Sequence, residues 1–271
     1  MTVDVEDYFQ VSAFEPHFEP SDWDRIELRV DRNVDRILEL FDGHGVKATF
    51  FVLGWIAQRR PELVRRIAAQ GHEIASHGFN HTRVTNQERD DFRGDVRDTK
   101  RLLEDTAGCE VIGYRAATYS INESNLWALD VLAETGHRYS SSIYPIEHDL
   151  YGIPDAPRFR FKVGASQLTE VPITTVSLLG KNWPCGGGGY FRLFPYAVTR
   201  WAIKRVNEAE GQSAVFYFHP WEIDPEQPRV PGVSLRTRFR HYLNLDRVEP
   251  RLDRLLGDFR WDRLDRAFAL R

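Results

Sequence analysis

Short apolar runs alternate with segments of helical periodicity along the first two-thirds of the chain. Between positions 31 and 42, for example, apolar residues recur at the spacing of one helical face, and an apolar run over 48–53 follows. The apolar runs predicted as strands are 2–3, 48–53, 73–75, one starting at 111–112, one near Tyr139, 168–173 and 214–218. The segments predicted as helices are 31–42, one starting at Pro61, one capped by Thr85 and Glu88 and ended by Gly108, 124–135 and 196–209. Repeated strand–helix units of this size predict an α/β fold, namely a (β/α) barrel of eight strands or fewer.

Two connections rich in proline and glycine interrupt this pattern. Residues 146–161 read as a long loop, and residues 225–232 lead into a helical C-terminal segment. We therefore expect a single domain over 1–271, with an extension from about 225 to 271 packed on it. From 229 to 271 eleven arginines face six acidic residues, a net charge of +5, but the signs are interspersed. Interspersed charge favours a solvated helical face over a patch for anionic ligands.

Composition excludes several classes of protein. The 271 residues carry 36 Lys and Arg against 40 Asp and Glu, a net charge of −4, whereas nucleic-acid binders usually show a basic excess. The chain lacks a run of eighteen apolar residues, so no membrane span is predicted. The acidic start reads as a strand rather than a leader, and only Cys109 and Cys185 are present. These features favour a cytoplasmic location and leave a periplasmic one open, and the oligomeric state is not predicted.

Polar residues follow the ends of several predicted strands. They are Asp4, Glu6, Asp7, His77, His81, Arg115 and His219. Barrel enzymes carry their chemistry on the loops after the carboxyl ends of the strands, so these side chains are expected to converge. Each has an ordinary alternative: a solvated turn, surface histidines, a surface arginine, or a histidine buried in the core.

If they converge, the set offers a defined chemistry. Two imidazoles and one carboxylate can hold a divalent cation, while a second carboxylate accepts a proton from an activated water. Arg115 would pair with that carboxylate and lower its pKa, and His219 would protonate a leaving amine. Trp183, Tyr190, Phe191 and Trp221 are candidates for stacking on sugar rings, although aromatic residues lie more often in the core. The glycines at 186–189 lack the Lys-Ser/Thr of a phosphate loop and instead favour tight turns or the close approach of a ligand.

The strings TVDVED, SHGFNH, GYRAATYS and FYFHPWEID occur in this order, and with them the chain resembles the polysaccharide deacetylases of carbohydrate esterase family four. DVEDYFQV, GGGGYFRLFP, YFHPWEID and HYLNLDR resemble more narrowly the subfamily of bacterial exopolysaccharide and exosortase loci. The resemblance implies a distorted (β/α)₇ barrel that removes N-acetyl groups from amino sugars of a polysaccharide.

The resemblance also implies roles for individual residues. Asp4 matches the catalytic base, Arg115 its partner and His219 the acid, and Tyr119, Trp183, Tyr190 and Trp221 are the substrate-binding candidates. His77 and His81 match the metal ligands, and either Glu6 or Asp7 supplies the carboxylate. The implied ion is Zn²⁺, with Ni²⁺, Co²⁺ or Mn²⁺ as alternatives. Ala117 stands where relatives carry proline, and Ser140 stands where they commonly carry an aspartate that orients catalytic side chains.

Three functions are compatible with this set of residues. The first is a metal-dependent deacetylase of an N-acetylated polysaccharide. The second is a metal-free hydrolase of small cyclic amides on the same barrel. The third is a glycan-binding protein with a degenerate site, which the departures at Ala117 and Ser140 suggest.

Overall fold

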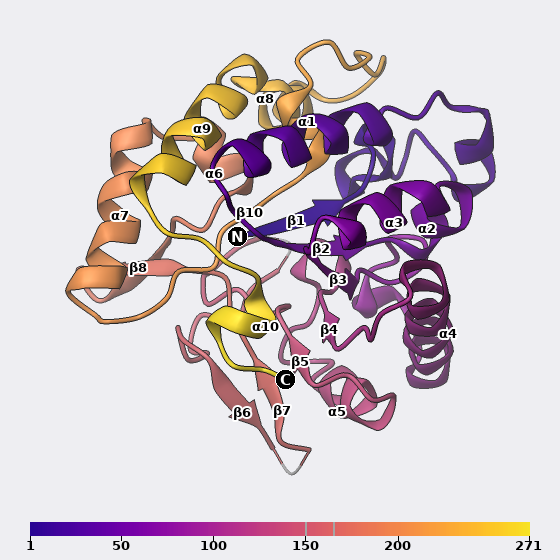
Figure 1. Cartoon of the computed structure of the whole chain (residues 1–271), viewed down its shortest axis with the longest axis horizontal. Helices are drawn as coiled ribbons and strands as arrows, with labels where there is room; N and C mark the ends of the chain where they lie inside the picture. The colour runs from indigo at the N-terminus through magenta and orange to yellow at the C-terminus, as the bar shows by residue number, and fades with distance from the viewer. Residues whose placement is uncertain (150, 165) are drawn as a thin grey trace.

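One strongly curled sheet forms the centre of the computed structural model, which describes residues 1–149, 151–164 and 166–271 (Figure 1). Within these residues its strand order is β10-β1-β2-β3-β4-β5-β7-β6, and all neighbours pair in parallel except β6 and β7. The strands are β1 (Thr2–Val5), β2 (Thr49–Val52), β3 (Glu73–Ser76), β4 (Gly113–Tyr114), β5 (Tyr139–Ser140), β6 (Phe161–Val163), β7 (Leu168–Glu170) and β10 (Tyr217–Phe218). The seven parallel strands confirm the predicted barrel of the (β/α)₇ type.

The glycine run lies where the barrel closes, between β7 and β10. The Tyr217 amide donates to the Gly186 carbonyl at 2.8 Å, and Gly187 forms a bridge with Tyr217. Gly187 has a φ of +118°, and a Cβ there would lie 1.9 Å from the Tyr217 carbonyl oxygen. These glycines therefore allow two backbones to approach each other.

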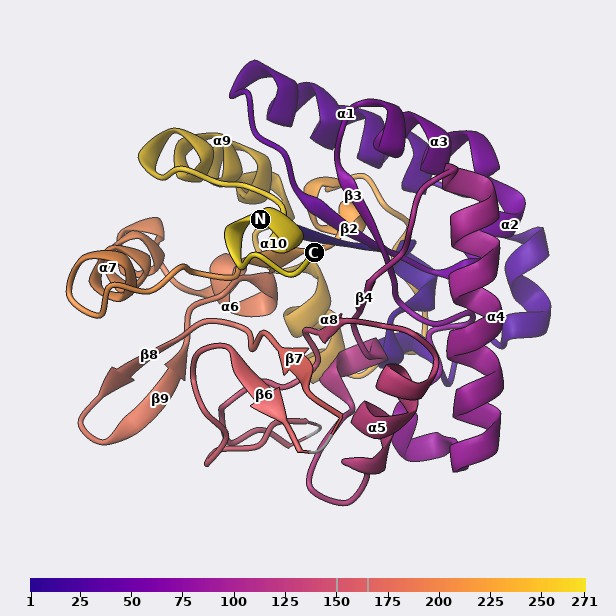
Figure 2. The same cartoon turned by 60° about the horizontal axis from the view of Figure 1, so that its bottom comes forward.

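Helices surround the sheet (Figure 2). The predicted face of the first helix is confirmed, because Val34, Ile37, Leu38 and Phe41 are all buried. The helices of this layer are α1 (Val30–Gly43), α2 (Gly54–Arg59), α3 (Pro61–Ala69), α4 (Arg89–Ala107), α5 (Trp127–Glu134), α6 (Gly188–Leu193) and α7 (Tyr196–Glu208). Short 3₁₀ helices cover Tyr8–Gln10, Ser12–Phe14, Pro20–Arg25, Val84–Asn86, Ala117–Tyr119, Pro220–Ile223 and Leu245–Arg247.

Two local predictions need correction, and one hairpin was not predicted. Thr85 does not cap α4, because it lies in a 3₁₀ turn and Glu88 is the residue that precedes the helix. The strands are shorter than the apolar runs, since β7 ends at Glu170 and β10 covers only two residues. The hairpin of β8 (Thr175–Leu178) and β9 (Lys181–Pro184) was not predicted, and it forms a separate two-stranded sheet. The loop predicted over 146–161 ends where β6 begins, and position 150 lies outside the described residues.

The C-terminal segment is helical, as predicted. It contains α8 (Leu235–Tyr242), α9 (Val248–Asp258) and α10 (Leu264–Ala267). The buried Arg192 of α6 joins it to the barrel by donating from Nη1 to the carbonyls of Arg240 and His241, at 3.0 and 2.6 Å. None of the helices in the described part of the chain is long and apolar enough to cross a membrane.

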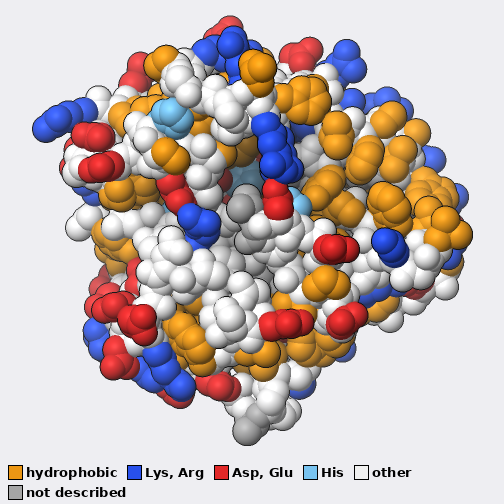
Figure 3. Space-filling view, turned by 180° about the vertical axis from the view of Figure 1, so that it is seen from behind, with side chains coloured by type: hydrophobic (Ala, Val, Ile, Leu, Met, Phe, Trp, Pro, Cys, Tyr) orange, Lys and Arg blue, Asp and Glu red, His pale blue; other side chains and the backbone are white. Residues whose placement is uncertain are grey.

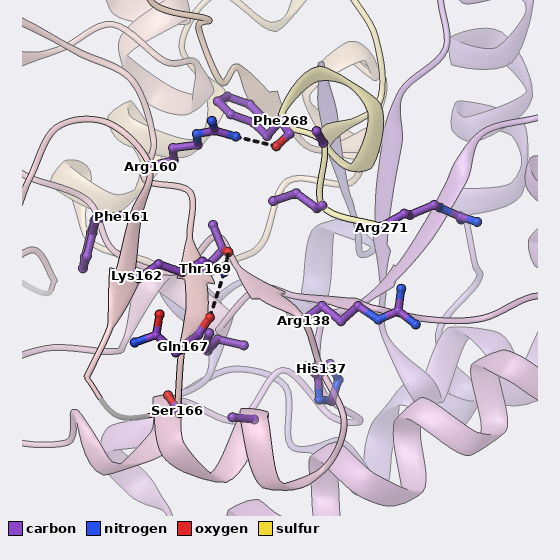
Figure 4. A pocket seen from close by; sticks show the side chains of 14 residues that line it. His137, Arg138, Arg160, Phe161, Lys162, Ser166, Gln167, Thr169, Phe268 and Arg271 are labelled. Atoms are coloured by element: carbon purple, nitrogen blue, oxygen red, sulfur yellow. Dashed lines mark hydrogen bonds between the residues drawn. The ribbon is translucent and has the colours of Figure 1, made fainter.

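A cavity of about 700 Å³ opens at the amino ends of β5 and β7 (Figure 4). Arg138 and Thr169 line it, and the Arg160 side chain donates across it to the Phe268 carbonyl at 2.6 Å. Parallel-barrel enzymes carry out their chemistry at the opposite ends of the strands, so this cavity is not the expected reaction site.

Candidate functional site

The predicted polar residues meet at the carboxyl ends of four strands in one part of the sheet. Glu6 follows β1, His77 follows β3, Arg115 follows β4 and His219 follows β10. The parallel register places Val5 beside Val52, Val52 beside Ser76 and Ser76 beside Tyr114, so these strand ends lie at one edge of the sheet. The convergence expected from the sequence is therefore present.

Glu6, His77 and His81 form a buried group whose ligand atoms all lie within 4.8 Å of one another. His81 Nε2 lies 2.9 Å from Glu6 Oε2. Within the described residues Glu6 Oε2 and His81 Nδ1 are nevertheless buried without a hydrogen-bond partner. Orphaned buried polar atoms of this kind fit a bound cation, and the set of two imidazoles and one carboxylate is suited to Zn²⁺.

The ring of His77 is held in a ligand-ready orientation. Its Nδ1 lies 2.8 Å from the Arg115 carbonyl oxygen, which can only accept, so Nδ1 donates. Burial lowers the pKa of His77 to about 4, and the nearby Asp4 only partly opposes this effect. The neutral ring therefore keeps the lone pair of Nε2 free for a metal ion.

Asp7 does not belong to the group of Glu6, His77 and His81, because its carboxylate accepts hydrogen bonds from backbone amides. Oδ1 accepts from the Tyr8 amide at 2.8 Å, and Oδ2 accepts from the amides of Arg29 and Val30 at 2.6 and 2.9 Å. Gln10 completes a capping box by accepting from the Asp7 amide. The structure thus brings Glu6, and not Asp7, to the two histidines. The Asp-x-x-Gln spacing was the sequence signal for this capping role.

Asp4 and Arg115 form a buried ion pair beside the group. Arg115 Nη1 lies 2.6 Å from Asp4 Oδ1, and both side chains are almost fully enclosed. Burial lowers the pKa of Arg115, but Asp4 together with Tyr119 and Tyr139 outweighs that effect and raises the pKa, so the guanidinium stays charged. The other carboxylate oxygen, Oδ2, faces the Tyr119 hydroxyl at 3.5 Å and His219 Nε2 at 3.9 Å.

His219 faces both carboxylates from the opposite side. Its Nε2 lies 3.4 Å from Glu6 Oε1, while its Nδ1 lies 2.7 Å from Glu222 Oε1. Burial lowers the pKa of His219, but Glu6 and Glu222 outweigh it and raise the pKa to about 9. A protonated imidazole is thereby held next to Asp4 at neutral pH.

Two residues that support His219 were not predicted. Glu222 accepts from the His219 ring and from its amide, and Arg192 Nε donates to the other Glu222 oxygen at 2.7 Å. The His-x-x-Glu spacing after a strand is a capping-box pattern, so Glu222 was open to detection in the sequence. Arg192 comes from α6, and nothing in its local sequence indicates this contact.

The structure corrects the predicted role of Trp221. Its ring stacks on His219 at 5.2 Å and on His241 at 4.2 Å, and its Nε1 donates to Glu6 Oε1 at 3.2 Å. Trp221 is only 5% exposed, so its ring is not available to stack on a sugar, and it positions the polar residues instead. Tyr119 is equally buried with its hydroxyl facing Asp4, and substrate binding by Tyr119 stays a prediction.

The other two aromatic candidates, Trp183 and Tyr190, line a cavity of about 660 Å³ between the 146–158 region and the β8–β9 hairpin. The Trp183 side chain is half exposed. Tyr190 shares a hydrogen bond with Tyr151, whose ring lies 5.9 Å from that of Tyr119. The cavity thus adjoins the polar group through tyrosines, and sugar stacking by Trp183 and Tyr190 stays a prediction.

Serines surround Arg115 where an aspartate was expected. Arg115 Nη2 donates to Ser141 Oγ at 2.9 Å and Nε donates to the Ser141 carbonyl, while Ser140 Oγ donates to Ser142 Oγ. The Glu170 carboxylate lies behind them and accepts from the amides of Ser142 and Ile143. Arg115 is thus oriented without an aspartate at Ser140. Ala117 begins the 3₁₀ turn that carries Tyr119, and the positive φ of Thr118 and Tyr119 sets the shape of this turn.

Comparison with known families divides the chain into two parts. Residues 23–140 match the polysaccharide deacetylase family, and residues 141–269 match a domain of unknown function, DUF3473.

Individual relatives agree with the first match. A peptidoglycan-N-acetylglucosamine deacetylase of Bacillus cereus is 35% identical over 96 residues, which are 35% of each chain. A chitooligosaccharide deacetylase of Sinorhizobium fredii is 32% identical over 108 residues, 40% of this chain and 48% of the relative. The chain thus spans less than half the length of these curated relatives.

A solved structure from Mycobacterium smegmatis, assigned to the polysaccharide deacetylases, superposes with a TM-score of 0.63. It is 22% identical, and the match covers 100% of this chain and 88% of that chain. This likeness supports the fold.

Proposed function

Because residues 23–140 of this chain belong to the polysaccharide deacetylase family, we propose that the protein hydrolyses N-acetyl groups of amino sugars in a polysaccharide and releases acetate. One observation carries the proposal. The Asp4–Arg115 pair, at 2.6 Å, lies beside the buried group of Glu6, His77 and His81, and His219 faces it from the other side. This is the set of groups that metal-assisted amide hydrolysis requires.

Glu6, His77 and His81 would hold the ion, with Zn²⁺ as the expected metal and Ni²⁺, Co²⁺ or Mn²⁺ as alternatives. When bound, a divalent cation polarises the acetyl carbonyl and lowers the pKa of a water molecule. The Trp221 indole and the Arg115 carbonyl orient two of the protein ligands, Glu6 and His77.

Asp4 accepts the proton of the attacking water through Oδ2, which Arg115 leaves free because the guanidinium binds Oδ1. His219 then gives its proton to the departing amine nitrogen. Glu222 and Arg192 keep that imidazole oriented and charged.

The proposal extends to the substrate and the location. Relatives include deacetylases of peptidoglycan N-acetylglucosamine and of chitooligosaccharides, which supports a glycan that contains N-acetylglucosamine. A bacterial exopolysaccharide is the specific substrate that we propose, and the proposed location is the cytoplasm. The cavity lined by Trp183 and Tyr190 would hold sugar residues next to the reacting one.

Acetate release from N-acetylglucosamine oligomers tests the proposal, with the bound metal measured by elemental analysis. The metal-loaded protein should release acetate, chelation should stop the release, and His77→Ala should lose both the activity and the metal. His17→Ala, which changes an exposed histidine, serves as the matched control. Undiminished acetate release by His77→Ala, or activity in protein that contains no metal, would contradict the proposal and favour the metal-free hydrolase. Glycan binding without acetate release would favour the degenerate binding protein.

A further inference from the structure

The β8–β9 hairpin ends in an exposed leucine. The two residues of its turn, Leu179 and Gly180, have φ values of +54° and +75°, which correspond to the left-handed region. Hairpin turns of this kind favour Asn-Gly, because leucine pays a steric penalty at positive φ. Leu179 is 93% exposed, so burial of its side chain does not offset this steric penalty.

Further apolar side chains extend this tip into a surface. The hairpin packs on α7 through Val176, Cys185 and Ala202, while Leu178, Leu193, Val198 and Trp201 are 43–47% exposed. We call Leu178, Leu179, Leu193, Val198 and Trp201 the apolar ridge. Hydrophobic side chains gather over the same side of the molecule, on the right of Figure 3. Exposed apolar side chains gathered on one side of a molecule often mark an interaction surface.

The segment that carries most of the apolar ridge contains cations but no acidic residue of its own. Residues 171–207 contain five basic residues, Lys181, Arg192, Arg200, Lys204 and Arg205, and no aspartate or glutamate. Arg192 is buried against Glu222, and the other four are exposed. Arg200 pairs with Asp258 and Lys204 lies 3.7 Å from Glu208. Lys181 and Arg205 make no ion pair within the part of the chain that the structure describes.

We propose that the apolar ridge docks on the surface of an anionic lipid bilayer, with the Leu179 tip inserted among the headgroups. Leucine and tryptophan side chains partition into this interfacial layer, and nearby cations add attraction to anionic lipids. The cation excess of this segment, in which Lys181 and Arg205 are unpaired within the described residues, favours an anionic membrane over a second copy of this chain. Two copies would bring these cations together at the contact. The proposal does not depend on the deacetylase activity.

Sedimentation with vesicles tests the docking. The full chain should pellet with vesicles of equal parts phosphatidylcholine and phosphatidylglycerol, less with pure phosphatidylcholine, and less at high salt. Leu179→Asn removes the apolar tip and supplies the residue that the turn favours. It should lower partitioning about tenfold without lowering the melting temperature. Leu126→Asn, at an exposed leucine of the α5 N-terminus, should leave partitioning unchanged.

Three outcomes would overturn the proposal. In the first, the wild-type chain would stay in the supernatant with anionic vesicles. In the second, Leu179→Asn would bind the vesicles as well as the wild type does. In the third outcome, light scattering would show a dimer that Leu179→Asn dissociates, which would assign the apolar ridge to self-association. A normal rate of acetate release by Leu179→Asn would show that membrane docking and deacetylation are independent of each other.

Discussion

At the scale of single residues, opposing electrostatic effects decide what the polar group can do. Burial alone would make His219 a weaker base, yet two carboxylates raise its pKa to about 9. One of them, Glu222, lies on the side away from Asp4. Burial raises the pKa of Glu222, but Arg192 and His219 together outweigh this effect and lower it, so Glu222 stays ionised. The charge of His219, the proposed acid, is therefore controlled by Glu222 and Arg192, which do not belong to the reacting groups.

Replacing Glu222 with glutamine tests this control. The proposed acid works only when protonated, so activity should fall as the pH rises through the pKa of His219. Glu222→Gln removes a negative charge that raises this pKa. The alkaline limb of the kcat–pH profile should therefore move to lower pH, with a reduced kcat at pH 8. Glu226→Gln makes the same chemical change at an exposed position and should leave the profile unchanged. An alkaline limb that does not move in Glu222→Gln would remove His219 from the role of acid.

Most of the proposed site was predictable at this scale, because its residues follow apolar strands directly. The choice between Glu6 and Asp7 was not predictable, since it depends on the amides of Arg29 and Val30, which come from a distant segment. The enclosure of Trp221 was missed for a similar reason. One of the rings that cover it, His241, belongs to α8.

At the scale of elements, the approach of the glycine run to β10 determines whether the barrel closes. Gly187→Ala would place a Cβ 1.9 Å from the Tyr217 carbonyl oxygen, at a φ of +118° that side chains rarely adopt. We expect a loss of at least about 2 kcal/mol in the free energy of unfolding, measured by urea denaturation. Gly189→Ala is the matched control, because its nearest atom lies 3.7 Å away at the flexible end of Arg192. Equal stability of the two variants would show that the contact with Tyr217 does not hold the barrel closed.

Helices were predicted better than strands at this scale. Helical periodicity extends over many residues. The helices α1 and α7 agree with the predicted ranges to within two residues at each end, and α3 begins at Pro61 as predicted. The strands β4, β5 and β10 contain two residues each, so the apolar runs around them overstate their length. The turn between β8 and β9 carries Leu-Gly instead of Asn-Gly, so the usual sequence signal of a hairpin turn is missing there.

At the scale of the whole molecule, the end of the chain closes the amino-terminal side of the barrel. The amide of Leu264 donates to Thr49 Oγ1 at 2.8 Å, and the amide of Asp265 donates to Glu73 Oε2 at 3.2 Å. Arg263 reaches the Gly71 carbonyl at 3.0 Å. Both termini accordingly lie near the amino ends of the strands (Figure 1). Glu73 thus links β2, β3 and the C-terminal segment.

Glu73 should also make the stability of the molecule depend on pH. Burial, together with the neighbouring Asp265, raises its pKa from 4.5 to about 7, whereas Arg263 and Arg271 help to keep Asp265 ionised. A carboxyl group with a raised pKa in the folded state stabilises the fold fully below pH 4.5, and this contribution is lost as the pH rises through 7. The variant Glu73→Gln has no ionisable group at this position and tests the effect.

Between pH 5 and pH 8 the free energy of unfolding of the wild type should fall by roughly 1–3 kcal/mol relative to that of Glu73→Gln, measured by urea denaturation. Glu62→Gln, at an exposed glutamate, should show no such shift. A difference that stays constant over this range would mean that Glu73 is already ionised at pH 5 in the folded barrel, so that its contacts with the C-terminal segment are those of a carboxylate from pH 5 to pH 8.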